Sequence, residues 1–122
     1  MENILANDPC RRFTTGTTVQ GRTLRLWFAN HSFVLKTEPI DLLTDHRRLI
    51  HFFLALSFAP RTVDLGWDPT IVRAGYNCDD DQWMYVVCVD GQFFTTAWLL
   101  ADFTDQGHAG RWTRVWLVRD CD

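Results

Sequence analysis

Residues 45–70, DHRRLIHFFLALSFAPRTVDLGWDPT, decide how the rest of the chain is arranged. Apolar side chains recur at helical spacing over residues 49–58, and Pro60 ends the pattern. These side chains lie around most of the helix circumference, which is typical of a helix that is buried on more than one side. We therefore predict a buried central helix over residues 45–59, in which Phe53→Ala should cost about 3–5 kcal/mol.

The composition is that of one ordered globular domain over residues 1–122. Hydrophobic residues make up 47% of the chain and charged residues 22%, which excludes a disordered chain. The formal charge of −3 provides no attraction for nucleic acid or for an anionic membrane. The first residues lack a signal-peptide pattern, and no apolar stretch is long enough to span a bilayer. We expect a cytoplasmic or nuclear protein with neither a membrane nor a nucleic-acid partner.

The segments on both sides of the helix have β-strand patterns. The expected strands are 12–20, 23–30, 32–37, 71–76, 83–89, 92–103 and 111–120. Asp90-Gly91 between two apolar runs is the strongest hairpin signal, although the run that follows it is long enough to be helical in part. The predicted fold class is α+β, with a largely antiparallel sheet of about five to seven strands packed on one central helix.

Local signals mark the ends of these elements. Either Asp41 or Thr44 can cap the helix, and Gly66 supplies a turn after it. Residues 1–10 form a short polar lead that we expect to be frayed.

The basic and sulfur-containing residues favour structural roles. Lys36 is the only lysine among twelve basic residues, and arginine is the better partner for bidentate contacts with carboxylates. We therefore predict several Arg–Asp pairs. The cysteines contain no C-x-x-C pair, which favours reduced thiols without a redox or zinc role. They are Cys10, Cys78, Cys88 and Cys121.

Metal and nuclease sites are poorly supported by the sequence. The four histidines show no ligand spacing with cysteine, and His51 reads as a core or boundary residue. The acidic run 79–81 lacks the glycine and the distal glutamate of a calcium loop, so we expect a solvated tip. Lys36 and Glu38 could share one strand face in a nuclease, but no second carboxylate is placed beside them.

The tryptophans could form a stacking platform for single-stranded nucleic acid. Burial in the core is the simpler explanation for those within apolar strand patterns, namely Trp83, Trp98, Trp112 and Trp116. Trp27 and Trp67 lie outside this group, and their exposure would decide whether such a platform is available.

Five segments together resemble a known family. They are FTTG at 13–16, LRLW at 24–27, the helix at 49–58, LGWDPT at 65–70 and GRWTRVW at 110–116. In this order they resemble the N-terminal portion of the fungal-type protein kinase family of mushroom-forming fungi. The resemblance covers most of residues 11–120, and it implies that residues 107–122 are the start of a kinase-like N-lobe.

The resemblance also implies a nucleotide-binding segment at the end of the chain. Gly110, Arg111 and Thr113 match the family's phosphate loop, which usually reads G-R-G-T. Glycine in such a loop lets backbone N–H groups approach a phosphate closely. Trp112 occupies the position of the second glycine, where its indole would obstruct that approach. ATP and Mg²⁺ are expected as cofactors only if the remaining kinase lobes are present, and this chain alone is expected to hold none.

The catalytic parts of a kinase are not found in these 122 residues. A kinase needs a lysine on the strand after the glycine loop, an H-R-D catalytic loop and a metal-binding D-F-G. Lys36 lies upstream, the HRRL run at 46–49 has an arginine in place of the base, and the DFT run at 102–104 lacks the glycine. We therefore expect no catalysis by this chain alone.

Three functions remain open on this reading. The leading hypothesis is a non-catalytic N-terminal fragment, or truncated member, of the family that regulates or docks a protein partner, either a kinase-like domain or another copy of itself. One alternative is the N-terminal piece of an active ATP-dependent protein kinase. Another is a stand-alone protein-interaction domain, which predicts a contiguous exposed apolar patch. An unpaired final strand would favour docking by strand addition.

Overall fold

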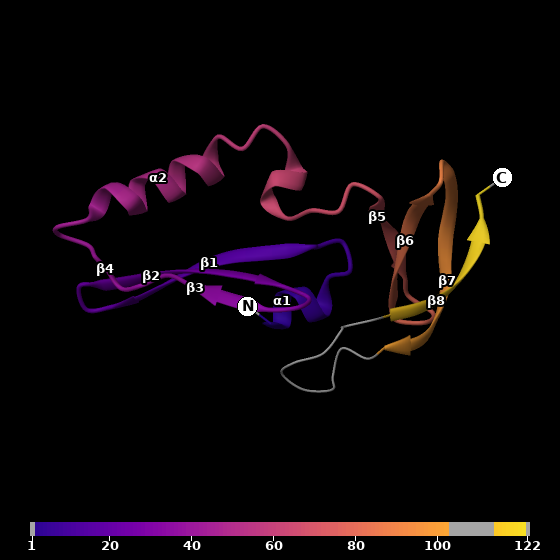
Figure 1. Cartoon of the computed structure of the whole chain (residues 1–122). Coiled ribbons are helices and arrows are strands. Elements are labelled where there is room, and N and C mark those ends of the chain that lie inside the picture. Colours follow the sequence, from indigo (N-terminus) through magenta and orange to yellow (C-terminus); the bar gives the residue numbers. More distant parts are fainter. Residues whose placement is uncertain (1, 103–113, 122) are drawn as a thin grey trace.

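The computed structural model describes residues 2–102 and 114–121, which form two antiparallel sheets and two α-helices (Figure 1). The helices are α1 (Glu2–Asn7) and α2 (His46–Ser57), with a 3-10 turn at Thr62–Leu65. The first sheet contains β1 (Phe13–Gln20), β2 (Thr23–Asn30), β3 (Val34–Lys36) and β4 (Ile40–Asp41). The second contains β5 (Ile71–Asn77), β6 (Gln82–Val89), β7 (Gln92–Asp102) and β8 (Arg114–Asp120). The α+β class is confirmed, with the strands divided between two sheets.

Strand β2 is the centre of the first sheet. It pairs with β1 along its whole length, from Phe13 opposite Asn30 to Gln20 opposite Thr23. Its other edge pairs with β3 and, at the opposite end, with the short β4. The turn between β1 and β2 contains Gly21 at a positive φ of 60°, which lets the two strands form a tight hairpin.

Both faces of the first sheet are covered in part. Leu24 and Ile40 are opposite each other and are 2% and 3% exposed. Thr14 and Ala29 form a buried pair on the other face, because successive side chains of a strand alternate between faces. Helix α1 contacts β1 and buries Leu5 completely, so the expected frayed lead is instead a helix. Figure 1 shows α1 and α2 on opposite sides of this sheet.

The second sheet has the simple strand order β5-β6-β7-β8. Asp90 and Gly91 both have positive φ values, 50° and 79°, as the predicted tight hairpin between β6 and β7 requires. Strand β7 is extended throughout, so the helical alternative for this run is wrong. Its register against β8 shifts between Thr96 and Trp98 and again between Leu99 and Ala101. The strands of this sheet run across the direction of those in the first sheet (Figure 1).

Helix α2 lies where the sequence predicted a helix, but it is not buried. None of its residues, all of which the structure describes, falls in the buried class, and Phe53 is 48% exposed. Its less exposed stripe consists of Leu49, Phe52 and Leu56, at helical spacing, and the helix contacts the first sheet at β4. The predicted burial on several sides is wrong because, in the part of the chain that the structure describes, only the first sheet lies against the helix.

The start of α2 also differs from the prediction. The residue at the N-cap is Asp45, and its side chain makes no capping hydrogen bond. Asp41 lies in β4, where its carboxylate accepts hydrogen bonds from the backbone N–H groups of Leu43 and Thr44, at 2.8 and 3.3 Å. Asp41 therefore stabilises the turn that precedes the helix rather than the helix itself. Neither described helix is long and apolar enough to cross a membrane.

Gly66 joins the segment after α2 to the start of β1. Its φ is 95°, and a Cβ at this position would lie 2.2 Å from the carbonyl oxygen of Phe13. The backbone N–H of Arg12 donates to the Gly66 carbonyl, and that of Asp68 donates to the Cys10 carbonyl, both at 2.7 Å. Only glycine combines this backbone conformation with such a close approach. The GWDP turn is therefore a structural joint.

Candidate functional site

The predicted phosphate-loop residues lie outside the described part of the chain. This applies to Gly110, Arg111 and Thr113 and also to Trp112. The structure describes the strands on either side, and it pairs Asp102 at the end of β7 with Arg114 at the start of β8. The Arg114 Nε atom is 3.5 Å from the Asp102 carboxylate. Residues 103–113 therefore connect two neighbouring antiparallel strands.

Two of the kinase-like features in the sequence, the HRRL run and Lys36, lie away from the strands that flank residues 103–113. The HRRL run at 46–49 opens α2, where Arg48 pairs with the Asp45 carboxylate at 3.1 Å. Lys36 lies on β3, in the other sheet, with its ammonium 5.8 Å from the centre of the Trp27 ring. Among the described residues, no lysine lies on a strand beside β8. These positions give each residue a structural role.

The histidine and metal alternatives gain no support from the geometry. His51 is exposed, so its expected core or boundary position is wrong. The Nε2 atom of His31 is 2.9 Å from the Arg11 carbonyl oxygen, which fixes the ring against the main chain. Lys36 and Glu38 are both exposed. Within residues 2–102 and 114–121, no group of three or more His, Cys, Asp or Glu side chains could hold a metal ion.

The four cysteines are free, as predicted. Burial, together with the nearby Asp8 carboxylate, raises the pKa of the Cys10 thiol to about 11. A thiol in this state is a poor nucleophile at neutral pH. Cys88 is partly buried, whereas Cys78 and Cys121 are exposed.

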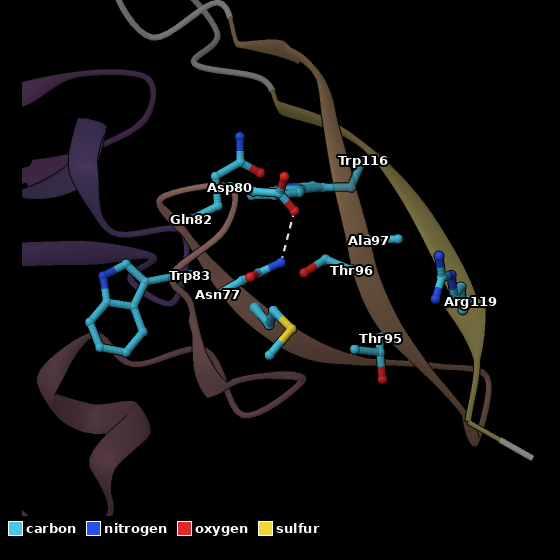
Figure 2. A pocket seen from close by; sticks show the side chains of 10 residues that line it. Asn77, Asp80, Gln82, Trp83, Thr95, Thr96, Ala97, Trp116 and Arg119 are labelled. Carbon is cyan, nitrogen blue, oxygen red and sulfur yellow. Dashed lines mark hydrogen bonds between the residues drawn. The ribbon is translucent and has the colours of Figure 1, made fainter.

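A small polar hollow of about 200 Å³ lies on the second sheet near the β5–β6 turn (Figure 2). Asn77 Nδ2 donates to the Asp80 carboxylate at 2.8 Å, and the Tyr76 hydroxyl donates to Asp81. Asp80 and Trp116 both line this hollow, and Figure 2 shows Arg119 on β8 farther across the sheet. The acidic run is a solvated tip, as predicted, and its polar groups hold the turn in shape.

A second hollow of about 550 Å³ lies where the two sheets meet. Its lining includes Cys10, Trp67, Ile71 and Val72, so it is largely apolar. Its charged groups are held by the chain itself. Arg73 contacts Asp8 at 3.5 Å and lies 4.6 Å from the Trp83 ring centre, and Asp68 is paired with Arg12 at 3.0 Å. This hollow is part of the joint between the sheets.

The predicted Arg–Asp pairs are confirmed, and one of them sits at the joint. Burial opposes ionisation of Asp68, but hydrogen bonds from Arg12 and Thr70 outweigh it and lower the pKa of this carboxyl. Arg11 lies over the Trp67 ring at 4.1 Å from its centre. Further pairs among the described residues are Arg22–Asp41, Arg48–Asp45, Arg61–Asp64, Arg73–Asp8 and Arg114–Asp102.

One exposed apolar feature is the outward stripe of α2 and its C-cap. This stripe consists of four side chains that are between 47% and 77% exposed, namely Ile50, Phe53, Leu54 and Phe58. They follow one another at i, i+3, i+4 and i+8, so they share one face of the helix. The four residues can be recognised in the sequence, but because they are apolar they were predicted to be buried. Only the absence of a second covering layer in the described chain reveals it as surface.

The second sheet also has an apolar face that is open. Val72, Phe93, Trp98 and Leu117 share this face and are 60%, 55%, 49% and 53% exposed. An antiparallel sheet that faces water on one side normally carries polar residues there. The buried residues of this sheet are Tyr85 and Thr96, on the opposite face. The core positions predicted for Trp83 and Trp98 are wrong, since both are exposed.

The family comparison agrees with where the motifs lie in the fold. The FTTG and LGWDPT segments meet at the joint of Gly66 with Phe13, and the final motif leads into β8. A sequence model described as fungal protein kinase matches residues 1–122. Comparisons with curated proteins and with solved structures found no match. The match spans the whole sequence, and the chain therefore belongs to the fungal protein kinase family.

Proposed function

We propose that these residues form a non-catalytic docking module of the fungal protein kinase family, and that the outward stripe of α2 is its docking surface. The observation that carries the proposal is the exposure of Ile50, Phe53, Leu54 and Phe58. The opposite stripe of the same helix faces the first sheet, so the outward stripe has no structural task in the described chain. Amphipathic helices commonly bind a partner by laying such a stripe into an apolar groove.

The charges at the start of α2 define the partner further. The first turn carries His46, Arg47 and Arg48 and no acidic residue, and Asp45 just before it pairs with Arg48. The N-terminal end of a helix is already electropositive, so basic side chains there are unfavourable for the helix itself. A carboxylate-rich rim on the partner would relieve this repulsion. We therefore infer a kinase-like domain with an apolar groove and an acidic rim at the end that meets His46.

The non-catalytic part of the proposal is supported by the residues that are present. The position of a catalytic aspartate in the HRRL run is filled by Arg48, which pairs with Asp45. The only lysine of the sequence lies on β3, away from the strands that flank residues 103–113. A docking role requires neither group.

The docking surface can be tested by measuring binding to an immobilised kinase-like domain of the same family. We expect the double variant Ile50→Glu, Leu54→Glu to bind at least about tenfold more weakly, because two charges would enter the apolar groove. The control is Val19→Glu, which places one such charge at a side chain that is 59% exposed on β1. Equal binding by the double variant, or equal loss in the control, would contradict the proposal.

A second candidate is the N-terminal piece of an active ATP-dependent kinase. It is favoured by one observation, the pairing of β7 with β8 around the segment that contains Gly110. Calorimetric titration of ATP–Mg²⁺ into the chain distinguishes the two. The docking module predicts no submillimolar binding and no phosphotransfer, whereas both together would establish the enzyme.

A further inference from the structure

We propose that the carboxylate of Asp68 clamps the angle between the two sheets, and that the joint becomes a hinge at Pro69 when this clamp is released. Every described strand before Asp68 belongs to the first sheet, and every described strand after Thr70 belongs to the second. The chain passes from one sheet to the other between α2 and β5 (Figure 1). Hinges in proteins are commonly a few residues at the ends of such elements.

The part of the joint that belongs to the first sheet ends at Asp68. The backbone N–H of Asp68 donates to the Cys10 carbonyl at 2.7 Å. Beside this hydrogen bond, Arg11 and Trp67 form an antiparallel bridge. The segment that ends at Asp68 is therefore held as a short strand against the residues that lead into β1.

The part that belongs to the second sheet begins at Thr70. The backbone N–H of Cys88 on β6 donates to the Thr70 carbonyl at 2.8 Å, and the next residue, Ile71, pairs with Val87. Pro69 thus lies between two segments that each have backbone hydrogen bonds to their own sheet. Because the proline ring fixes its φ, a change in the angle between the sheets takes place at the ψ of Pro69 and at the dihedrals of its neighbours.

One oxygen of Asp68 connects the two sides of this joint. Its Oδ1 atom accepts a hydrogen bond from the Arg12 guanidinium at 3.0 Å, on the side of the first sheet. Across Pro69, the same oxygen accepts from the Thr70 N–H at 2.9 Å and from the Thr70 hydroxyl at 2.6 Å. Hydrogen bonds to a carboxylate are stronger than those between neutral groups, and such a turn fixes the backbone that it spans. Asp68 therefore holds both sides of Pro69 in one geometry.

The rest of the joint leaves room for a change of angle. The hollow of about 550 Å³ lies between Trp67, on the side of the first sheet, and Ile71 and Arg73 on the second. Protein interiors are normally close-packed, so this empty volume gives the second sheet space to tilt. Arg73 also links the sheets through Asp8, but at 3.5 Å this contact is longer than any hydrogen bond of the Asp68 carboxylate. We therefore assign the fixed angle to Asp68.

The clamp can be tested by NMR, with residual dipolar couplings of the backbone amides measured in a partly aligned sample. In the unchanged chain, one alignment tensor should fit both sheets, because they keep a fixed angle. Asp68→Ala removes all three hydrogen bonds of the clamp, so each sheet should then fit only a tensor of its own. The matched control is Asp64→Ala, which removes a carboxylate paired with Arg61 at 2.9 Å on the side of the first sheet. This control should keep the single tensor.

Three outcomes would overturn the proposal: one common tensor for Asp68→Ala, separate tensors for the unchanged chain, or separate tensors for Asp64→Ala. If Asp68→Ala does not fold, Thr70→Val decides the question, because it removes the shortest of the three hydrogen bonds and keeps the shape of the side chain. Separate tensors are expected for this variant, and one common tensor would overturn the proposal. The measurement needs no partner, so its result is independent of the docking test on α2.

Discussion

The two sheets differ in how much of their apolar surface the chain covers. The first sheet lies between α1 and α2 and buries side chains on both faces, among them Leu24 and Ala29. The second sheet buries Tyr85 and Thr96 on one face and leaves the other open. Both sheets are built from apolar strands with similar patterns. The comparison shows that burial depends on whether a second layer is present, and not on how apolar a strand is.

The largest expected difference between the sheets concerns a leucine in each. Leu24→Ala should destabilise the fold by about 3–4 kcal/mol, because the side chain is 2% exposed and its loss leaves a cavity. Leu117→Ala should change stability by less than about 1 kcal/mol, since this side chain is already half in water. Urea unfolding at low protein concentration measures the free energy of unfolding of both variants. Similar values for the two would mean that the second sheet is as well covered as the first.

The joint at Gly66 should respond more strongly than the turn at Gly91. Gly66→Ala should cost about 3 kcal/mol, because it adds strain at positive φ and a clash with the Phe13 carbonyl oxygen. At Gly91 the φ is also positive, 79°, but nothing lies within 4 Å of an added Cβ. Gly91→Ala should therefore cost only about 1 kcal/mol. Thermal melts of the two variants compare the effect of the close approach directly.

Phe53 on α2 also tests whether a partly exposed apolar side chain contributes less to stability than a covered one. Phe53→Ala should cost about 1 kcal/mol or less, because the ring is 48% exposed and only part of its area leaves water on folding. The sequence pattern alone led to about 3–5 kcal/mol for this substitution. A denaturant-unfolding measurement near the larger value would show that another layer covers the helix in solution.

The smallest expected effect is the acid response of the joint. Arg12 and Thr70 lower the pKa of Asp68 below its ordinary value of 3.8. The stabilisation is thus present above the unfolded-state pKa and is lost as the pH falls through the lower folded-state value. The ion pair is partly exposed, so Arg12→Ala should cost less than about 1 kcal/mol at neutral pH. Melting temperatures from pH 6 to about pH 3 should fall less steeply for Arg12→Ala than for the unchanged chain.

Local sequence features predicted the strands and turns well. Asp90-Gly91 specified its hairpin because two consecutive positive φ values favour just these residue types. The helix over residues 46–57 was recognised from apolar spacing, and the Arg–Asp pairs from the preference of arginine for carboxylates. The short β4 and the burial of Leu5 were missed, because each depends on contact with a distant strand.

The candidate sites were less predictable than the fold. The phosphate-loop residues Gly110, Arg111 and Thr113 remain a prediction from resemblance, outside the described residues. The outward stripe of α2 has no distinctive sequence signal, since exposed and buried apolar stripes look alike.

The sequence by itself determined the local elements, the family and the glycine-dependent turns of this protein. These follow from backbone preferences and side-chain spacing within a few residues, as at Gly91, or from motifs in a set order. The tertiary structure decided that the described strands form two sheets and that, among residues 2–102 and 114–121, α2 is covered on one side only. Those outcomes depend on which segments lie against one another, and an apolar residue is chemically the same whether or not a neighbour covers it.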